Sequence, residues 1–267
     1  MIPNAELVHM LGQLARNQSG ITLMNIYKGL PMSYEGSING IGATEIQVRS
    51  NRYHIACLYH QRETFLQAEG LPVVVRSQVL SLNLAKETAL LSNFSTANNS
   101  IGKRGQVRVE ADDSLEATIQ FKEASFEIPV PLADISTGGA SIYCESQLFP
   151  SRVLQNGSEL SMTISFRDTT AQKLKKISSK PLIEGRDSRS FLRTNLLGSE
   201  DDRISIKAQG VVVSVRPELQ LRRFRLGVKL YFKDLSRSIV AQYIAKRQAE
   251  IIQDLRTLSE ELYSLKR

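Results

Sequence analysis

The chain has 267 residues with a formal net charge of +7, and 42% of them are apolar, enough for a sizeable core in two domains of ordinary size. It has no apolar run of 18 residues and no charged leader before an apolar block, so it predicts no membrane insertion and no signal peptide. Two cysteines are too few for a disulfide framework, which is typical of a cytoplasmic protein. The basic composition favours an anionic partner.

The first part of the chain predicts one short helix followed by a mostly β domain over residues 1–95. Leu7, Leu11 and Leu14 fall on one helical stripe, with Asn4 as its expected cap. From Gly20 onward the pattern changes to short β-type runs, including "TEIQVRS", with its strict alternation, and "YHIACLYH". The polar stretch "NFSTANNSIG" then predicts a linker, which we place at residues 96–103.

Alternation is more regular in residues 104–243, where it predicts five or six antiparallel strands. Their apolar faces comprise Leu115, Ala117, Ile119 and Phe121; Phe126, Ile128, Val130 and Leu132; Leu160, Met162, Ile164 and Phe166; and Phe224, Leu226, Val228, Leu230 and Phe232. A change of parity after Ala208 predicts a bulge at Gln209–Gly210. Residues 168–203 are charged and weakly periodic, and we interpret them as an insertion. The expected fold is mainly β, with two barrel-like domains, the second a six-stranded antiparallel barrel.

The end of the chain predicts a long helix, because residues 235–267 contain neither Gly nor Pro. Residues 244–267 form an extension in which apolar positions alternate at three and four residues, as in a coiled-coil seam. That extension predicts either self-association or packing of the helix on its own chain. The apolar residues proposed for a homo-oligomer are Ile244, Ile251, Leu255, Leu258, Leu262 and Leu265.

Two short motifs carry the functional prediction. "KRGQVRVE" places Lys103 before an RxxxR pair formed by Arg104 and Arg108. "DISTGG" follows at a strand end and contains Asp134, a serine and two glycines in a DxSxxG pattern. Alone, the first motif is compatible with a solvated strand and the second with an ordinary tight turn.

The order and separation of these motifs resemble the PilZ domain, a family that binds cyclic di-GMP. The matching residues are Arg104, Arg108, Asp134, Ser136 and Gly139, with Lys103 as an additional basic residue. The strand-to-helix segment "FRLGVKLYFKDLS" extends the resemblance, and the preceding β domain resembles the N-terminal module of flagellar-brake PilZ proteins by position and strand content.

The resemblance implies a cytoplasmic receptor, not an enzyme, with cyclic di-GMP as its ligand and no other cofactor. It further implies a change of inter-domain arrangement on binding and a protein partner that the sequence does not identify, such as the flagellar motor. DNA is not an expected partner.

The residue types fit this ligand on chemical grounds. An arginine fork donates to phosphate oxygens or to guanine O6 and N7, and it stacks on a base. The Asp134 carboxylate can accept from guanine N1–H and N2–H₂ or hold an arginine in place, and Ser136 can add a hydroxyl contact. Gly139 would let the backbone turn close to the ligand.

Other interpretations remain open. A basic nucleic-acid-binding protein would account for the charge, although the low aromatic content argues against base-stacking platforms. A PilZ-like adaptor that has lost its ligand is a third class. The cluster "LRRFR" is either a solvated strand face or an extra phosphate contact. The three histidines are scattered, so we expect no metal site, and we find no nucleophile–base pair that would indicate catalysis.

Overall fold

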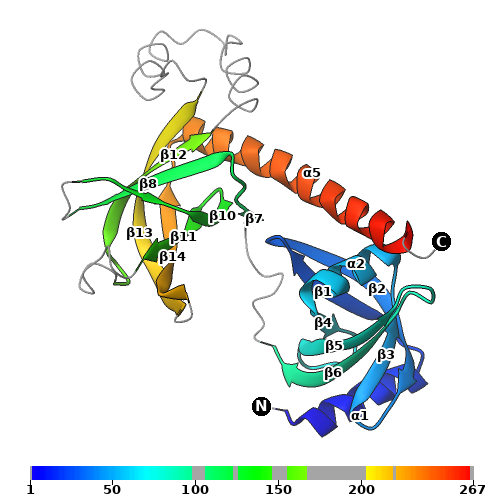
Figure 1. Ribbon diagram of the computed structural model, residues 1–267. Coiled ribbons are helices and arrows are strands. Elements are labelled where there is room, and N and C mark those ends of the chain that lie inside the picture. The colour runs from blue at the N-terminus through cyan, green and yellow to red at the C-terminus, as the bar shows by residue number, and fades with distance from the viewer. Residues whose placement is uncertain are drawn as a thin grey trace. The chain divides into compact units, whose positions relative to one another are not determined.

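The computed structural model describes residues 2–97, 106–122, 126–145, 155–166, 203–218 and 221–264. The chain divides into two compact units, Met1–Gly105 together with Gln248–Arg267, and Gln106–Arg247. Strands dominate both units (Figure 1). No helix in these ranges is both long enough and apolar enough to cross a membrane.

The first unit is a closed antiparallel barrel with strand order β1-β2-β3-β6-β5-β4. Its strands are β1 (Ile21–Tyr27), β2 (Leu30–Ile41), β3 (Glu45–Arg49), β4 (Glu63–Gln67), β5 (Val75–Asn83) and β6 (Thr88–Thr96). Helix α1 (Asn4–Arg16) buries Leu7, Leu11 and Leu14 in the same core as the inward strand positions. Asn4 does not cap this helix as expected, because its Oδ1 accepts the backbone N–H of Phe94 on β6 at 3.1 Å.

The "YHIACLYH" run is a helix, so its assignment as a β-type run is wrong. It lies in α2 (Arg52–Gln61), where the Asn51 side chain accepts the N–H of His54 at 2.9 Å and so caps the first turn. Arg62 ends the helix in the left-handed conformation (φ 59°). Short apolar runs of this length are compatible with a strand or with a buried helix. In this chain the Asn51 cap marks the run as a helix.

The second unit is an eight-stranded antiparallel sheet with the order β7-β10-β11-β14-β13-β12-β8-β9. Its strands are β7 (Val109–Glu110), β8 (Leu115–Phe121), β9 (Ile128–Val130), β10 (Leu132–Ser136), β11 (Gly139–Glu145), β12 (Glu159–Phe166), β13 (Ile204–Glu218) and β14 (Arg223–Tyr231). The expected apolar faces of β8 and β12 are buried along their whole length. Phe126 was expected to share the β9 face, but it precedes the strand and is 60% exposed.

The bulge in β13 lies three to four residues beyond its predicted place at Gln209–Gly210. Alternation continues through Gly210 and Val212, which are buried, and the pairing with β14 shifts between Val212 and Ser214. Position 210 faces the core, and it is a glycine because a Cβ there would lie only 2.8 Å from Val228 Cγ1. Because glycine has no apolar side chain, the buried position 210 broke the apolar alternation of the sequence and was interpreted as a bulge.

Helix α5 (Asp234–Ser264) contributes to both compact units along its length. Within the second unit, Val240 and Tyr243 are buried, and the Tyr243 hydroxyl lies 3.2 Å from Asp112 Oδ1. Within the first unit, Ile251, Leu255 and Leu262 are at most 7% exposed, and Asp254 pairs with Lys28 at 2.6 Å. Leu265 lies outside the described residues.

The burial of these seam positions favours the alternative in which the helix packs on its own chain. Ile244 is also buried, and Leu258 is half-buried. The prediction of a mainly β protein with two β units and a long C-terminal helix is confirmed. The closed six-stranded barrel is the first unit, whereas the second is an eight-stranded sheet. Nearly all of the predicted insertion, residues 168–202, lies outside the described residues.

Candidate anion-binding site on the second sheet

The DxSxxG motif forms the β10–β11 hairpin. Ser136 and Gly139 are paired across the ladder, with Thr137 and Gly138 in the turn. The Ser136 hydroxyl donates to Gly139 O at 3.1 Å and accepts the Gly138 N–H at 3.4 Å, which closes the turn. A Cβ on Gly139 would collide with the carbonyl oxygen of Val228 on β14. The serine and the second glycine therefore have structural roles in this hairpin that need no ligand.

Asp134 is the charged member of the motif, and it is held between two arginines. Arg108 Nη1 lies 3.3 Å from Asp134 Oδ1, and Arg225 Nη2 lies 2.6 Å from Asp134 Oδ2. The Asp134 side chain is only 13% exposed, whereas those of Arg108 and Arg225 are 33% and 39% exposed. Two positive charges thus meet one negative charge, and the cluster keeps an excess positive charge that reaches solvent.

Both arginines retain donors for another acceptor. Arg108 Nη1 contacts Asp134 and, at 3.5 Å, the Ser141 hydroxyl, while Arg225 uses Nη2. Neither guanidinium makes a further hydrogen bond within the described part of the chain. Because a guanidinium carries five N–H donors in a planar fork, an oxyanion can bind here without displacing Asp134.

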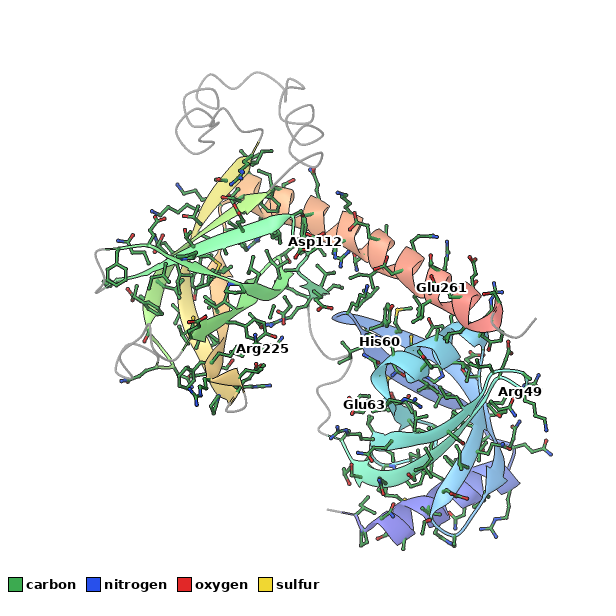
Figure 2. The ribbon with its side chains drawn as sticks, in the orientation of Figure 1. Arg49, His60, Glu63, Asp112, Arg225 and Glu261 are labelled. Atoms are coloured by element: carbon green, nitrogen blue, oxygen red, sulfur yellow. The ribbon has the colours of Figure 1, made fainter. Side chains whose placement is uncertain are left out.

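Small side chains form the floor beside this cluster. Ser141 pairs with Asp134 on β10 and with Gly227 on β14, and Gly227 pairs with Ser214 on β13. The next position along β14 on the same face is Arg225, labelled in Figure 2. Serine and glycine thus line this row beside the arginines, and the Ser214 hydroxyl fills the space next to Gly227, where a Cβ would collide with its Oγ.

The structure brings together the arginine of one motif and the aspartate of the other, which are 26 positions apart in the sequence. Lys103 and Arg104 lie outside the described residues. Arg225 was not among the predicted site residues, although "LRRFR" had been noted as a basic cluster. The alternation of the strand predicted that Arg225 lies on its outer face, but the sequence did not predict its ion pair with Asp134, 91 positions away.

Of the histidines and cysteines, His54, Cys57 and Cys144 are buried, whereas His9 and His60 are exposed. Burial lowers the pKa of His54 in the first unit to about 3. Burial raises the pKa of Cys57 and of Cys144 to about 12, so both thiols stay protonated at neutral pH. Across the described ranges, no group of three His, Cys, Asp or Glu side chains could hold a metal ion.

No protein-family model matches this sequence, and no curated protein matches it. Several solved structures are similar. The complex of K. pneumoniae MrkH with c-di-GMP has a TM-score of 0.43 at 9% identity, covering 94% of this chain and 97% of that one. The Bacillus subtilis inhibitor of motility MotI/DgrA has a TM-score of 0.39 at 15% identity, covering 87% and 97%.

The PilZ domain of Escherichia coli YcgR with c-di-GMP is also similar, with a TM-score of 0.36 at 12% identity over 57% of this chain and 96% of that one. Structural neighbours of this chain therefore include c-di-GMP complexes and a PilZ domain, the family that the sequence motifs resemble.

Proposed function

We propose that this protein is a non-enzymatic cyclic di-GMP receptor that binds the dinucleotide on the outer face of β10, β11 and β14. The observation that carries the proposal is the meeting of Arg108, from the RxxxR motif, with Asp134, from the DxSxxG motif, at 3.3 Å. Cyclic di-GMP presents phosphate oxygens and guanine edges, which match the open guanidinium donors and the carboxylate.

Each site residue has a distinct proposed role. Arg108 donates to a phosphate or to guanine O6 and N7, and Asp134 orients both arginines or accepts from guanine N1–H. Arg104 and Lys103 precede Arg108 by four and five positions, and in this proposal they donate to the same ligand. Ser136 and Gly139 shape the hairpin that presents Asp134.

The test is a calorimetric titration with cyclic di-GMP, with cyclic di-AMP as the control ligand. We expect wild type to bind the guanine form, and Arg104→Ala and Arg108→Ala each to lose about 1.5–3 kcal/mol, the scale of a hydrogen bond to a charged group. Arg189 belongs to a second RxxxR pair, "RSFLR", without a DxSxxG partner, so Arg189→Ala should bind as wild type. Equal losses in all three variants would indicate non-specific electrostatic binding and favour the nucleic-acid alternative.

The proposed output is a change in the arrangement of domains 1–95 and 104–243, because Arg104 lies where the linker meets the second domain. Small-angle scattering with and without saturating ligand tests this, and identical profiles would contradict it. The regulated partner that the flagellar-brake resemblance implies is a motor component. Ligand-dependent co-purification with motor proteins is the corresponding measurement.

A further inference from the structure

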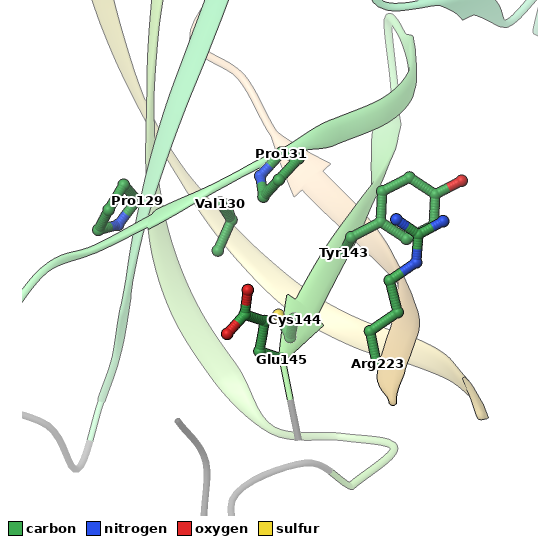
Figure 3. A pocket seen from close by; sticks show the side chains of 7 residues that line it. All are labelled: Pro129, Val130, Pro131, Tyr143, Cys144, Glu145 and Arg223. Carbon is green, nitrogen blue, oxygen red and sulfur yellow. The ribbon is translucent and has the colours of Figure 1, made fainter. Parts of the chain in front are cut away.

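The β14 strand carries a second arginine, Arg223, two positions before Arg225 on the same face. Its guanidinium carbon lies 3.6 Å from the centroid of the Tyr143 ring, and its Nε donates to Glu218 Oε2 at 2.7 Å. Figure 3 shows the guanidinium lying over the ring. Contact with the ring and with the carboxylate fixes the plane of this guanidinium. Arg223 is therefore a positioned group and not a solvated surface cation.

The register shows that both arginines lean in the same direction along the sheet. Arg225 pairs with Tyr143 but reaches Asp134, which belongs to the neighbouring row of Ser141 and Gly227. Arg223 pairs with Glu145 but lies on Tyr143, again one row away. Successive rows on one face are about 7 Å apart. Both guanidinium groups therefore lean toward Asp134, and Arg223 extends the cluster by one row along β14.

Glu145 and Arg223 also line a small cavity. Its volume is about 130 Å³, and Pro129, Pro131 and Tyr143 contribute to its walls (Figure 3). Although Glu145 and Arg223 are paired across the strands, Arg223 forms its ion pair with Glu218. The Glu145 carboxylate makes no ion pair with any residue in the described ranges. Both residues thus border the same hollow, with the Glu145 carboxylate on the Val130 side of β11 and the Arg223 guanidinium over Tyr143 on the other side.

We propose that Tyr143, Arg223 and Glu145 form a guanine subsite next to the Arg108–Asp134–Arg225 cluster; this inference rests on the proposed function. Arg223 lies against Tyr143 with one face, and its side chain is 31% exposed, so the other face is a platform for base stacking. Glu145 supplies the acceptor for guanine N1–H and N2–H₂. Adenine has no hydrogen on N1, so this carboxylate selects guanine.

In this arrangement the Asp134 cluster and the subsite bind different parts of the same ligand. The Asp134 cluster takes the phosphates and one guanine, and the Tyr143–Arg223–Glu145 subsite takes the other guanine. Arg225 contacts Asp134 and has its guanidinium 5.8 Å from the Tyr143 ring centroid, so it lies between the two. The ligand class that fits both ends is a dinucleotide with guanine at each end.

The subsite is tested by titrating Glu145→Gln, Arg223→Ala and Tyr143→Leu with cyclic di-GMP and cyclic di-AMP. We expect Glu145→Gln to bind cyclic di-GMP about 10- to 100-fold more weakly and to lose part of its discrimination against the adenine form, because the Asp134 cluster still contacts the other guanine. Arg223→Ala and Tyr143→Leu should weaken binding about tenfold, and Tyr143→Phe, which keeps the ring under the guanidinium, should restore it. Unchanged thermal unfolding would show that these variants fold.

The matched control is Arg216→Ala. Arg216 is exposed on the same face and pairs with Arg225 from β13, but it makes no ion pair within the described part of the chain. Its loss should change affinity by less than about threefold. If wild type and Arg108→Ala behave as proposed while the three subsite variants match Arg216→Ala, the guanine subsite is overturned and the receptor function stands. If wild type fails to bind cyclic di-GMP, both are overturned.

Discussion

The two units each contain a polar cluster, and the clusters differ in charge and in what they leave unpaired. In the barrel, Asn25, His54 and Thr64 are at most 1% exposed and neutral. Asn25 Nδ2 donates to Gln61 Oε1 and Glu63 O at 2.7 Å each, and its Oδ1 lies 2.9 Å from both His54 Nε2 and Thr64 Oγ1.

The cluster on the second sheet is charged, partly exposed and open. Arg108 and Arg225 bracket Asp134 and keep guanidinium donors that no other described residue accepts. In the barrel cluster His54 Nδ1 is buried without a hydrogen-bond partner among the described residues, but the other groups pair with one another. Such neutral pairs inside a core stabilise a fold, because breaking one leaves its partner buried and unpaired. Charged groups with unused donors at a surface are suited to a ligand. Position and pairing, more than the residue types themselves, separate a structural cluster from a binding one.

The largest expected effect concerns the apolar residues of α5, which belong to both units. Ile251→Asp places a charge at a position that is 0% exposed within the first unit, so we expect a loss of at least about 3 kcal/mol in urea unfolding. Its neighbour Ile252 is 38% exposed, and Ile252→Asp should cost less than about 0.5 kcal/mol.

Light scattering on the same proteins tests whether α5 packs on its own chain or mediates self-association. We expect wild type to be monomeric at tens of micromolar, because Ile251 and Leu255 are already covered by their own chain. A wild-type dimer that Ile251→Asp dissociates without loss of stability would instead support the self-association seam.

The barrel cluster should be the more sensitive of the two polar clusters. Asn25→Ala removes four contacts and leaves His54 and Thr64 buried without their shared acceptor, so we expect a loss of about 3 kcal/mol. Asp134→Asn should cost less than about 1 kcal/mol, because the arginines that lose their counter-charge remain partly solvated. Cyclic di-GMP affinity should show the reverse order. Equal stability losses would mean that the Asp134 cluster is also structural.

The pH dependence of stability distinguishes the clusters further. Burial lowers the pKa of His54 to about 3, against 6.5 for an exposed histidine. The unfolded chain therefore binds more protons than the folded one between these values, and stability falls as the pH falls through this window. From pH 7 to pH 5 this group should remove about 2 kcal/mol, measured by urea unfolding. His54→Gln should abolish that part, whereas His9→Gln should retain it because His9 is exposed.

The smallest effect is expected at Lys28 and Asp254, an ion pair within the first unit. The atoms lie 2.6 Å apart, but the side chains are 29% and 43% exposed. Lys28→Ala should therefore cost less than about 1 kcal/mol, and less still in 0.5 M salt, because solvent and ions screen such pairs. A loss comparable to that of Asn25→Ala would show that surface charge holds the helix in place more strongly than its apolar contacts.

Part of the fold and site was predictable from local pattern. The alternation of β8 and β12 identified their buried faces because neighbouring residues on a strand point to opposite sides of the sheet. The order and separation of the two motifs, which resemble those of the PilZ domain, predicted that Arg108 and Asp134 belong together, and the structure places their side chains 3.3 Å apart. The assignment of "YHIACLYH" was wrong, because eight mostly apolar residues fit a strand or a buried helix and only the Asn51 cap separates them.

The sequence by itself determined the strand periodicity, the long helix and the two motifs, because each is encoded within a few neighbouring positions. Tertiary structure decided which distant residues meet. It paired Arg225 with Asp134 across 91 positions, placed Arg223 against Tyr143, placed the β13 bulge beyond Gly210, and buried Ile251, which belongs to the first unit. Register between strands fixes such contacts, and register depends on how the whole sheet packs, which no local stretch of sequence contains.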